Sequence, residues 1–380
     1  MKKCVILAAV AGVAVSALGA NFGQGNLVVV RLGTGNTLSN AAQAVFLDEY
    51  TTAGVFVQSI AMPTSVSGLD RRLTMSGTAN SEGELTRSAD GNFLILAGYD
   101  ADVGTANVVN TTSATVNRVV ARVSVTGVSD TSTAISDAFS ANNVRGAASV
   151  DGSQFWLTGA NGGIRYTTYQ GASTTQINTV NNPGGLTPIT NSRCVNIFGG
   201  QLYVSAAQAS GRTGVFTIDT GLPTAAGASN SILPGTGGIT GQSPYDFVLS
   251  GNTLYVADDS AVAGVGGLQK FIFDGSNWNR TDTFTAGLPA SARLRQLTSM
   301  TDALGQTVVY ATTSYSNPAG GPDITAIVCL TDIGAGSSFT QIATGPAGTI
   351  FRGIEVTPIP APGALGLLGL AGLAAARRRR

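Results

Sequence analysis

YDFVLSGNTLYV, residues 245–256, decides the fold of this chain. Two runs of aromatic and β-branched residues flank Ser250, Gly251 and Asn252. Such runs favour strands, and a glycine between them supplies the positive φ that a tight hairpin turn needs. The segment therefore predicts an antiparallel β-hairpin.

The same hairpin pattern occurs five times along the chain. Successive turn glycines are 61, 48, 51 and 54 residues apart, at Gly91, Gly152, Gly200, Gly251 and Gly305. Further β-like runs follow the hairpins, for example at 164–169 and 176–180. A repeat of this length, holding four short strands, has the size of a β-propeller blade.

The two ends of the folded region carry incomplete sets of strands. Residues 351–357 resemble an inner strand without the strands behind it, whereas 26–32, 44–50 and 55–60 are three strand-like runs without an inner one. Pairing the two sets closes the ring and hides two sheet edges. We therefore predict an all-β body at residues 21–357, a six-bladed β-propeller closed by its N- and C-terminal strands.

The blade count has one main alternative. Residues 61–83 form the longest link without clear strand character, and loops of this length are usually functional or mobile. A degenerate seventh blade in this segment would raise the count to seven. A β-helix or a pair of β-sandwiches is a further alternative for the whole body.

Composition excludes several functional classes. The 21 acidic residues all lie in the body, but Lys2, Lys3 and four terminal arginines do not, so 15 basic residues remain and the body carries a net charge of about −6. With Lys270 as its single lysine, the body has no electrostatic footprint for nucleic acid. The chain has no histidine, which excludes histidine-based catalysis and histidine metal sites.

The first 20 residues predict a secretory signal peptide. Lys2 and Lys3 precede an apolar run that extends to Ala17, and small residues follow at Gly19 and Ala20. A charged start, a short apolar segment and a small-residue exit are the three parts of such a signal. Cleavage after Gly19 or Ala20 fits best.

The last 23 residues have three parts. A proline-rich junction at 358–362 favours an extended chain, an apolar segment at 363–376 follows, and four arginines end the chain. A helix over 363–376 would be about 21 Å long, so we expect a short C-terminal transmembrane helix with Arg377, Arg378, Arg379 and Arg380 retained on the inner side of the membrane.

This tail resembles a PEP-CTERM-type sorting signal. The resemblance implies secretion, processing by an exosortase-like enzyme at Pro360, Ala361 and Pro362, and delivery to the cell surface or extracellular matrix, with transient or permanent anchoring. The sequence has Ala361 where the family has glutamate, which puts the identity of the processing enzyme in doubt. An ordinary tail anchor without processing is the alternative. The body itself resembles secreted bacterial β-propeller proteins.

Arginines recur on the predicted inner strands. Aligning the repeats on their turn glycines puts Arg145, Arg193 and Glu84 at one position, while Arg352 matches Arg145 through a shared Arg-Gly and Arg295 lies nearby. Because inner strands line the axial channel of a propeller, these residues predict an anion-binding mouth suited to a carboxylate or a sulfated sugar. The alternative is that each arginine pairs with an acid from an adjacent blade, such as Glu84, Asp246 or Glu355.

Other candidate sites are weaker. Asp100, Asp102, Asp258 and Asp259 offer oxygen ligands for Ca²⁺, but their spacing is not that of a calcium loop, and solvated loop acids are the simpler interpretation. No other cofactor is predicted. Cys194 and Cys329 fall on non-adjacent blades and are expected to be two separate buried thiols.

These observations favour an exported, non-catalytic propeller scaffold that binds a protein or carbohydrate partner of the envelope or matrix. No catalytic residue is assigned. The alternative is a secreted, histidine-independent lyase or glycosidase that uses carboxylates on exported polysaccharide, since propellers host both kinds of function.

Overall fold

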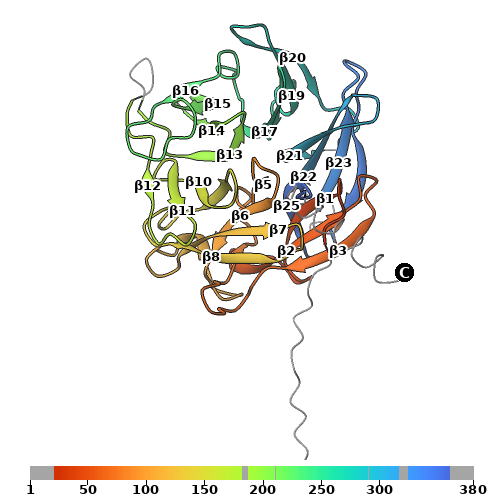
Figure 1. Cartoon of the computed structure of the whole chain (residues 1–380). Coiled ribbons are helices and arrows are strands. Elements are labelled where there is room, and N and C mark those ends of the chain that lie inside the picture. Colours follow the sequence, from red (N-terminus) through yellow and green to blue (C-terminus); the bar gives the residue numbers. More distant parts are fainter. Residues whose placement is uncertain (1–20, 182–186, 210, 290, 316–323, 360–380) are drawn as a thin grey trace, which may run out of the picture.

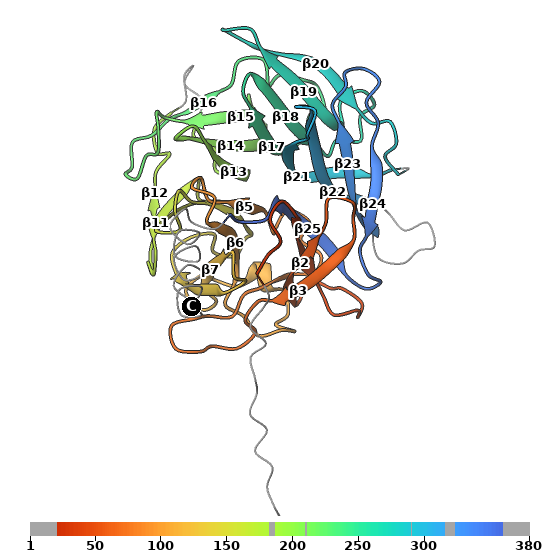
Figure 2. The same cartoon turned by 45° about the vertical axis from the view of Figure 1, so that its right-hand side comes forward.

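The computed structural model describes residues 21–181, 187–209, 211–289, 291–315 and 324–359. These residues are almost entirely strands and turns, and their one helical segment is the single 3-10 turn η1 (Val108–Asn110). Figures 1 and 2 show the strands gathered into sheets around a central axis. The predicted all-β class is confirmed for this part of the chain.

Four sheets stand separately and have four antiparallel strands each. Each sheet is one blade of a propeller arrangement, and its strands follow one another along the chain from the axis outward. The blades are β9 (Val144–Ala148), β10 (Gln154–Gly159), β11 (Arg165–Thr168) and β12 (Thr175–Gln176); β13 (Ser192–Phe198), β14 (Gln201–Gln208), β15 (Arg212–Ile218) and β16 (Asn230–Ile232); β17 (Pro244–Ser250), β18 (Thr253–Asp258), β19 (Gly267–Phe273) and β20 (Trp278–Phe284); and β21 (Arg293–Thr301), β22 (Thr307–Tyr315), β23 (Ile324–Thr331) and β24 (Thr340–Thr344).

The rest of the ring is one nine-stranded sheet. Its main path runs β25-β1-β2-β4-β6-β7-β8, with β3 paired to β2 and β5 paired to β6. The strands are β25 (Ile350–Val356), β1 (Leu27–Leu32), β2 (Ala42–Tyr50), β3 (Phe56–Ala61), β4 (Thr74–Ser76), β5 (Leu85–Arg87), β6 (Phe93–Tyr99), β7 (Arg118–Ser124) and β8 (Ser129–Ile135).

The prediction of six separate blades is therefore wrong. The cause is β4, which lies in the link 61–83 and pairs with β2 on one side and with β6 on the other, so that two groups of strands merge into one sheet. A three-residue strand leaves too weak a pattern to be recognised in a sequence. The same segment forms no seventh four-stranded sheet among the residues that the structure describes.

The first and last strands of the described body pair as expected. Strand β25 pairs antiparallel with β1, with Leu27 opposite Val356, and the Thr357 amide donates a hydrogen bond of 2.9 Å to the Asn26 carbonyl. The ring is closed by backbone hydrogen bonds between strands from opposite ends of the chain, and both strands gain a partner for an edge that would otherwise be open.

The five predicted hairpins are confirmed. The inner strands β5, β9, β13, β17 and β21 each pair with the next strand in sequence. All five turn glycines have positive φ, between 56° and 81°, which a side chain would disfavour. Glycine is required at these turns because of the backbone conformation.

The core lies between neighbouring sheets. One cluster joins the faces of the β17 and β21 blades through residues such as Phe247, Phe271 and Leu297, and another joins the strands of the nine-stranded sheet through residues such as Val30 and Leu96. Each fully buried side chain of this size contributes about 1.5–3 kcal/mol. Packing of sheet against sheet therefore holds the inner strands in place around the axis.

The terminal segments lie outside the described residues. They are the predicted signal peptide at 1–20 and most of the tail, at 360–380, including the helix expected at 363–376. In the described part of the chain, no helix is long and apolar enough to cross a membrane. Cys194 and Cys329 are both free, as predicted, but only Cys194 is fully buried.

Candidate functional site

Six strands line the axis. In the order β5, β9, β13, β17, β21 and β25, each contacts the next, and β25 contacts β5. Two successive positions on these strands define two layers of side chains. The arginine layer consists of Arg145, Arg193, Tyr245, Arg295 and Arg352, and the acid layer, one residue further along, consists of Glu84, Cys194, Asp246 and Gln296, with Gly146 and Gly353 completing it.

The arginines of this layer have acceptors within the protein, although the Nε atoms of Arg145 and Arg295 are buried without a hydrogen-bond partner among the described residues. Asp259 accepts from Arg193 at 3.3 Å and lies 3.4 Å from Nε of Arg295. Both guanidinium groups also lie over the ring of Tyr245, at 4.6 and 5.8 Å from its centroid. Arg145 donates to Asn191 Oδ1 and to the Ser192 carbonyl. The predicted set of arginines thus gathers at one mouth of the axis, with internal acceptors.

Asn80 closes this mouth. Its carbonyl accepts hydrogen bonds from the Tyr245 hydroxyl at 2.8 Å and from Arg295 at 3.4 Å, and its side-chain oxygen accepts from Arg352 at 2.9 Å. Asn80 belongs to the link 61–83, so this segment both joins two groups of strands and covers one end of the axis.

Glu84 lies in the acid layer, and its alignment with Arg145 is off by one residue. A Cβ added to Gly146 would lie 1.4 Å from Glu84 Oε2, so the carboxyl group occupies the space beside that glycine. Leu85 pairs with Leu96 whereas Ala147 pairs with Leu157, so the first hairpin has one residue more between paired positions. An alignment of the repeats on their turn glycines therefore shifts β5 by one residue relative to β9.

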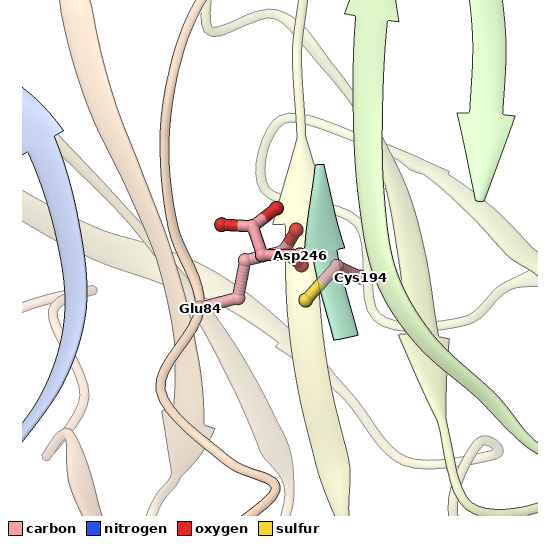
Figure 3. A group of neighbouring side chains, drawn as sticks. All are labelled: Glu84, Cys194 and Asp246. Atoms are coloured by element: carbon pink, nitrogen blue, oxygen red, sulfur yellow. The ribbon is translucent and has the colours of Figure 1, made fainter. Parts of the chain in front are cut away.

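The acid layer is buried and polar. Glu84 Oε1 accepts from the Val195 amide at 2.8 Å. Asp246 accepts from the Phe247 amide at 2.8 Å and from the Leu297 amide at 3.0 Å. Figure 3 shows Asp246 and Cys194 with Glu84 beside them, Glu84 coming from the segment that precedes β5. Three chemically reactive groups therefore share one small volume at the centre of the molecule.

Burial decides the protonation of these groups. Desolvation raises the pKa of Asp246 to about 7, although its amide donors oppose the shift. Desolvation also raises the pKa of Glu84 well above its usual range, and the neighbouring Asp246 adds to this shift. The pKa of the Cys194 thiol is raised well above its usual range by burial and by the nearby carboxyl groups.

A pocket opens at the other mouth, on the side of the hairpin turns. It has a volume of about 360 Å³ and is lined from five inner strands. Asp246 lies at its inner end, and Glu355, Asn196, Thr298 and Phe198 line its walls. Glu355 accepts from Thr298 at 2.7 Å and from the Val356 amide, and burial raises its pKa. The pocket offers carboxyl, amide and hydroxyl groups on a rigid frame.

The weak calcium candidates have protein partners. Asp100 and Asp102 both pair with Arg72, at 2.8 and 2.7 Å, away from the axial layers. Asp258 accepts from the amides of Ser243 and Ser260, and Asp259 pairs with arginines as described. The junction residues and the terminal arginines lie outside the described residues, beyond Ile359.

Sequence reasoning missed the acid layer as a unit. Cys194 was expected to be a separate buried thiol, and Asp246 and Glu355 entered only in the alternative, as arginine partners. The structure gives both acids backbone amide donors. A usable signal existed, because Cys194 and Gln296 both directly follow an arginine of the inner strands. Because the two layers are only one residue apart along each strand, a register error of one residue exchanges them. The acid layer can therefore be recognised in the sequence only if the inner strands are aligned in the correct register.

No protein-family model matches this sequence, and none of the curated proteins is similar to it. Solved structures with a similar arrangement include an oxidoreductase from Thermus thermophilus described as a glucose dehydrogenase, with 15% identity, a TM-score of 0.37, and coverage of 79% of this chain and 98% of that one. YCF48 bound to D1 peptide has 11% identity, a TM-score of 0.36, and coverage of 74% and 94%. A GH43 glycoside hydrolase has 9% identity, a TM-score of 0.32, and coverage of 83% and 82%. These likenesses are distant, and the fold assignment rests on the strand pairing described above.

Proposed function

We propose that this protein is a non-catalytic binding propeller whose axial pocket takes a small, hydroxyl-rich ligand, with a neutral saccharide as the best fit. The observation that carries the proposal is the 360 Å³ pocket with Asp246 and Glu355 on its surface. Pockets of roughly 300–1,000 Å³ suit small molecules, and a few fixed polar groups orient the ligand in them.

The lining supports this ligand class. Asp246 and Glu355 are held by backbone amides, which fixes their oxygens, and carboxyl oxygens accept hydrogen bonds from sugar hydroxyls. Asn196 and Thr298 add an amide and a hydroxyl, and Phe198 gives the wall an apolar face. An anionic ligand would meet the carboxyl groups of Asp246 and Glu355 at this mouth, with Arg87 as the cation among the lining residues. At the opposite mouth, Asp259 and Asn80 already accept hydrogen bonds from the arginines.

The cellular location belongs to the same proposal. Residues 1–20 have the parts of a secretory signal, and 358–380 resemble a surface-sorting tail. We therefore propose an exported protein whose ligand is a saccharide of the envelope or matrix. Mass spectrometry of the protein recovered from its native source tests this: an N-terminus at Ala20 or Asn21 and loss of the terminal arginines are expected, and an intact cytoplasmic chain would contradict it.

Binding is tested by titrating the purified protein with a panel of neutral mono- and oligosaccharides in a calorimeter. Glu355→Gln and Thr298→Val should each weaken binding at least tenfold, since both alter the pocket wall. Asp274→Asn is the matched control, because Asp274 lies on the exposed turn between β19 and β20. Binding that neither pocket variant changes, or no saccharide binding at all, overturns the proposal.

One observation favours a second candidate, a carboxylate-dependent glycosidase or lyase. Asp246 has a pKa of about 7 and faces the same pocket as Glu355, and an acid with such a pKa can donate a proton near neutral pH. A turnover screen on polysaccharides separates the two functions. Turnover by the wild-type protein that Asp246→Asn abolishes would establish the enzyme instead.

A further inference from the structure

The acid layer contains a set of metal-ligand atoms. One carboxyl oxygen each from Glu84 and Asp246 and the Cys194 sulfur all lie within 4.8 Å of one another. All three residues are buried, and they come from three different inner strands or their entry (Figure 3). A tetrahedral zinc ion, with ligands at about 2.0–2.3 Å, holds such atoms roughly 3.5 Å apart, so a contraction of about 1 Å would form the site.

Two oxygen atoms in this layer are buried without a hydrogen-bond partner. Glu84 Oε2 and Gln296 Oε1 accept no hydrogen bond from a nitrogen or oxygen of the described residues, and the Cys194 thiol is the donor beside the Glu84 carboxyl group. The two residues are only 1% and 3% exposed. The amide group of Gln296 lies in the same layer, because its nitrogen donates to Cys194 Sγ at 3.2 Å. Buried acceptors without a partner are costly in a folded protein, and a bound ion would satisfy them.

The backbone leaves room for the cluster. Gly146 lies beside the Glu84 carboxyl group, and Gly353 passes so close to the Gly83 carbonyl that a Cβ would lie 2.4 Å from it. Two of the six inner strands thus contribute no side chain to this layer. Asp246 also lines the axial pocket, so one ligand of the cluster borders that pocket.

The surroundings suit a bound cation. Two carboxylates and a thiolate around a divalent ion leave one net negative charge, and Arg145 of the adjacent layer interacts electrostatically with Cys194.

We propose that Glu84, Cys194 and Asp246 bind one divalent ion of the zinc type at the propeller axis. Thiolate and carboxylate ligands together favour zinc, and the Gln296 amide supports the sulfur from the outer sphere. The site shares Asp246 with the saccharide pocket but requires neither Glu355 nor Thr298, so variants of those two residues separate the two proposals.

The test uses the full chain, stripped with a chelator and titrated with Zn²⁺ and, as a spectroscopic probe, Cd²⁺. The chain has three cysteines, so the Cys4→Ser, Cys329→Ser double variant serves as the reference and leaves Cys194 alone. We expect this reference to bind one equivalent of either ion and to show the ultraviolet cadmium–thiolate absorption.

Ligand variants in this reference decide the outcome. Adding Cys194→Ser should abolish the cadmium–thiolate absorption, and adding Glu84→Gln should weaken Zn²⁺ binding at least tenfold, with circular dichroism showing the same fold. Glu355→Gln should leave metal binding unchanged, which keeps this result separate from the saccharide test. Absence of stoichiometric uptake by the folded reference, or absorption that persists in Cys194→Ser, overturns the proposal.

Discussion

The two mouths of the axis differ in how their charged side chains are hydrogen-bonded and in whether a pocket remains there. At the arginine mouth, Asn80 and Asp259 supply acceptors for the guanidinium groups and close the opening. At the hairpin mouth, Asp246 and Glu355 are satisfied mainly by backbone amides, and a pocket remains open above them. The arginine layer, although it is the more obvious charged feature in the sequence, therefore has a structural role. Asp246 and Glu355 instead face the pocket that a ligand can enter.

The largest loss of stability is expected from a substitution of Gly146, which lies between the two mouths. Gly146→Ala places a Cβ 1.4 Å from Glu84 Oε2, so the acid layer must move, and we expect a loss of about 3 kcal/mol or more in the free energy of unfolding. Urea denaturation measures it. Gly336→Ala is the control, because no atom lies within 4 Å of its added Cβ. Equal stability of the two variants would show that the layer is not tightly packed.

The next effect is a pH dependence that arises at the open mouth. Asp246 has a pKa of about 7 in the folded state, above that of an unfolded aspartate near 3.9, so the folded state binds the proton more tightly. Its contribution is fully present below about pH 4 and is lost as the pH rises to about 7, by roughly 2–4 kcal/mol. Urea denaturation of the metal-free protein across this range should show the loss, and Asp246→Asn should reduce it. An unchanged profile in the variant would contradict the assignment.

A smaller effect is expected at the closed mouth. Asp259→Asn removes the carboxylate that Arg193 and Arg295 share, and since these groups are 15–20% exposed the cost should be about 1–2 kcal/mol. Sulfate should recover part of the stability of the variant by binding the two guanidinium groups. Thermal unfolding with sulfate and with chloride at equal ionic strength measures this. No difference between the two anions would mean that the mouth stays closed to anions.

The smallest effect concerns the cover of that mouth. Asn80→Ala removes the acceptor of one Arg352 hydrogen bond but keeps the backbone carbonyl that accepts from Tyr245, so we expect a loss of about 1 kcal/mol. Asn36→Ala, at an exposed site, is the control and should be nearly neutral. A loss several times larger would show that the whole link 61–83 depends on this side chain.

The sequence predicts much of the fold because its signals are local. Each hairpin is marked by a glycine with positive φ between apolar runs, as at Gly251, and the incomplete strand sets at the two ends identify β1 and β25 as partners. The merging of two groups of strands through β4 could not be predicted, since a three-residue strand is defined by its distant partners and not by its own pattern.

The candidate site was harder to predict than the fold, because its contacts also depend on residues that are distant in the sequence. The arginines were correctly expected to gather on the inner strands, but their acceptors, Asn80 and Asp259, come from loops whose positions depend on tertiary packing. Glu84 was placed one residue out because hairpins of unequal length shift the register. A one-residue error is enough to move a carboxyl group from one layer to the next.

The pairing of β25 with β1 also fixes an order of events in folding. Strand β1 lies near residue 30 and its partner near residue 353, so this contact has almost the largest sequence separation that the chain allows. Contacts of that kind form late, because loop closure costs entropy before the pairing repays it. During synthesis β1 must therefore wait with an open edge until nearly the whole chain has been made, and in that interval the edge is the part of the protein most exposed to mispairing.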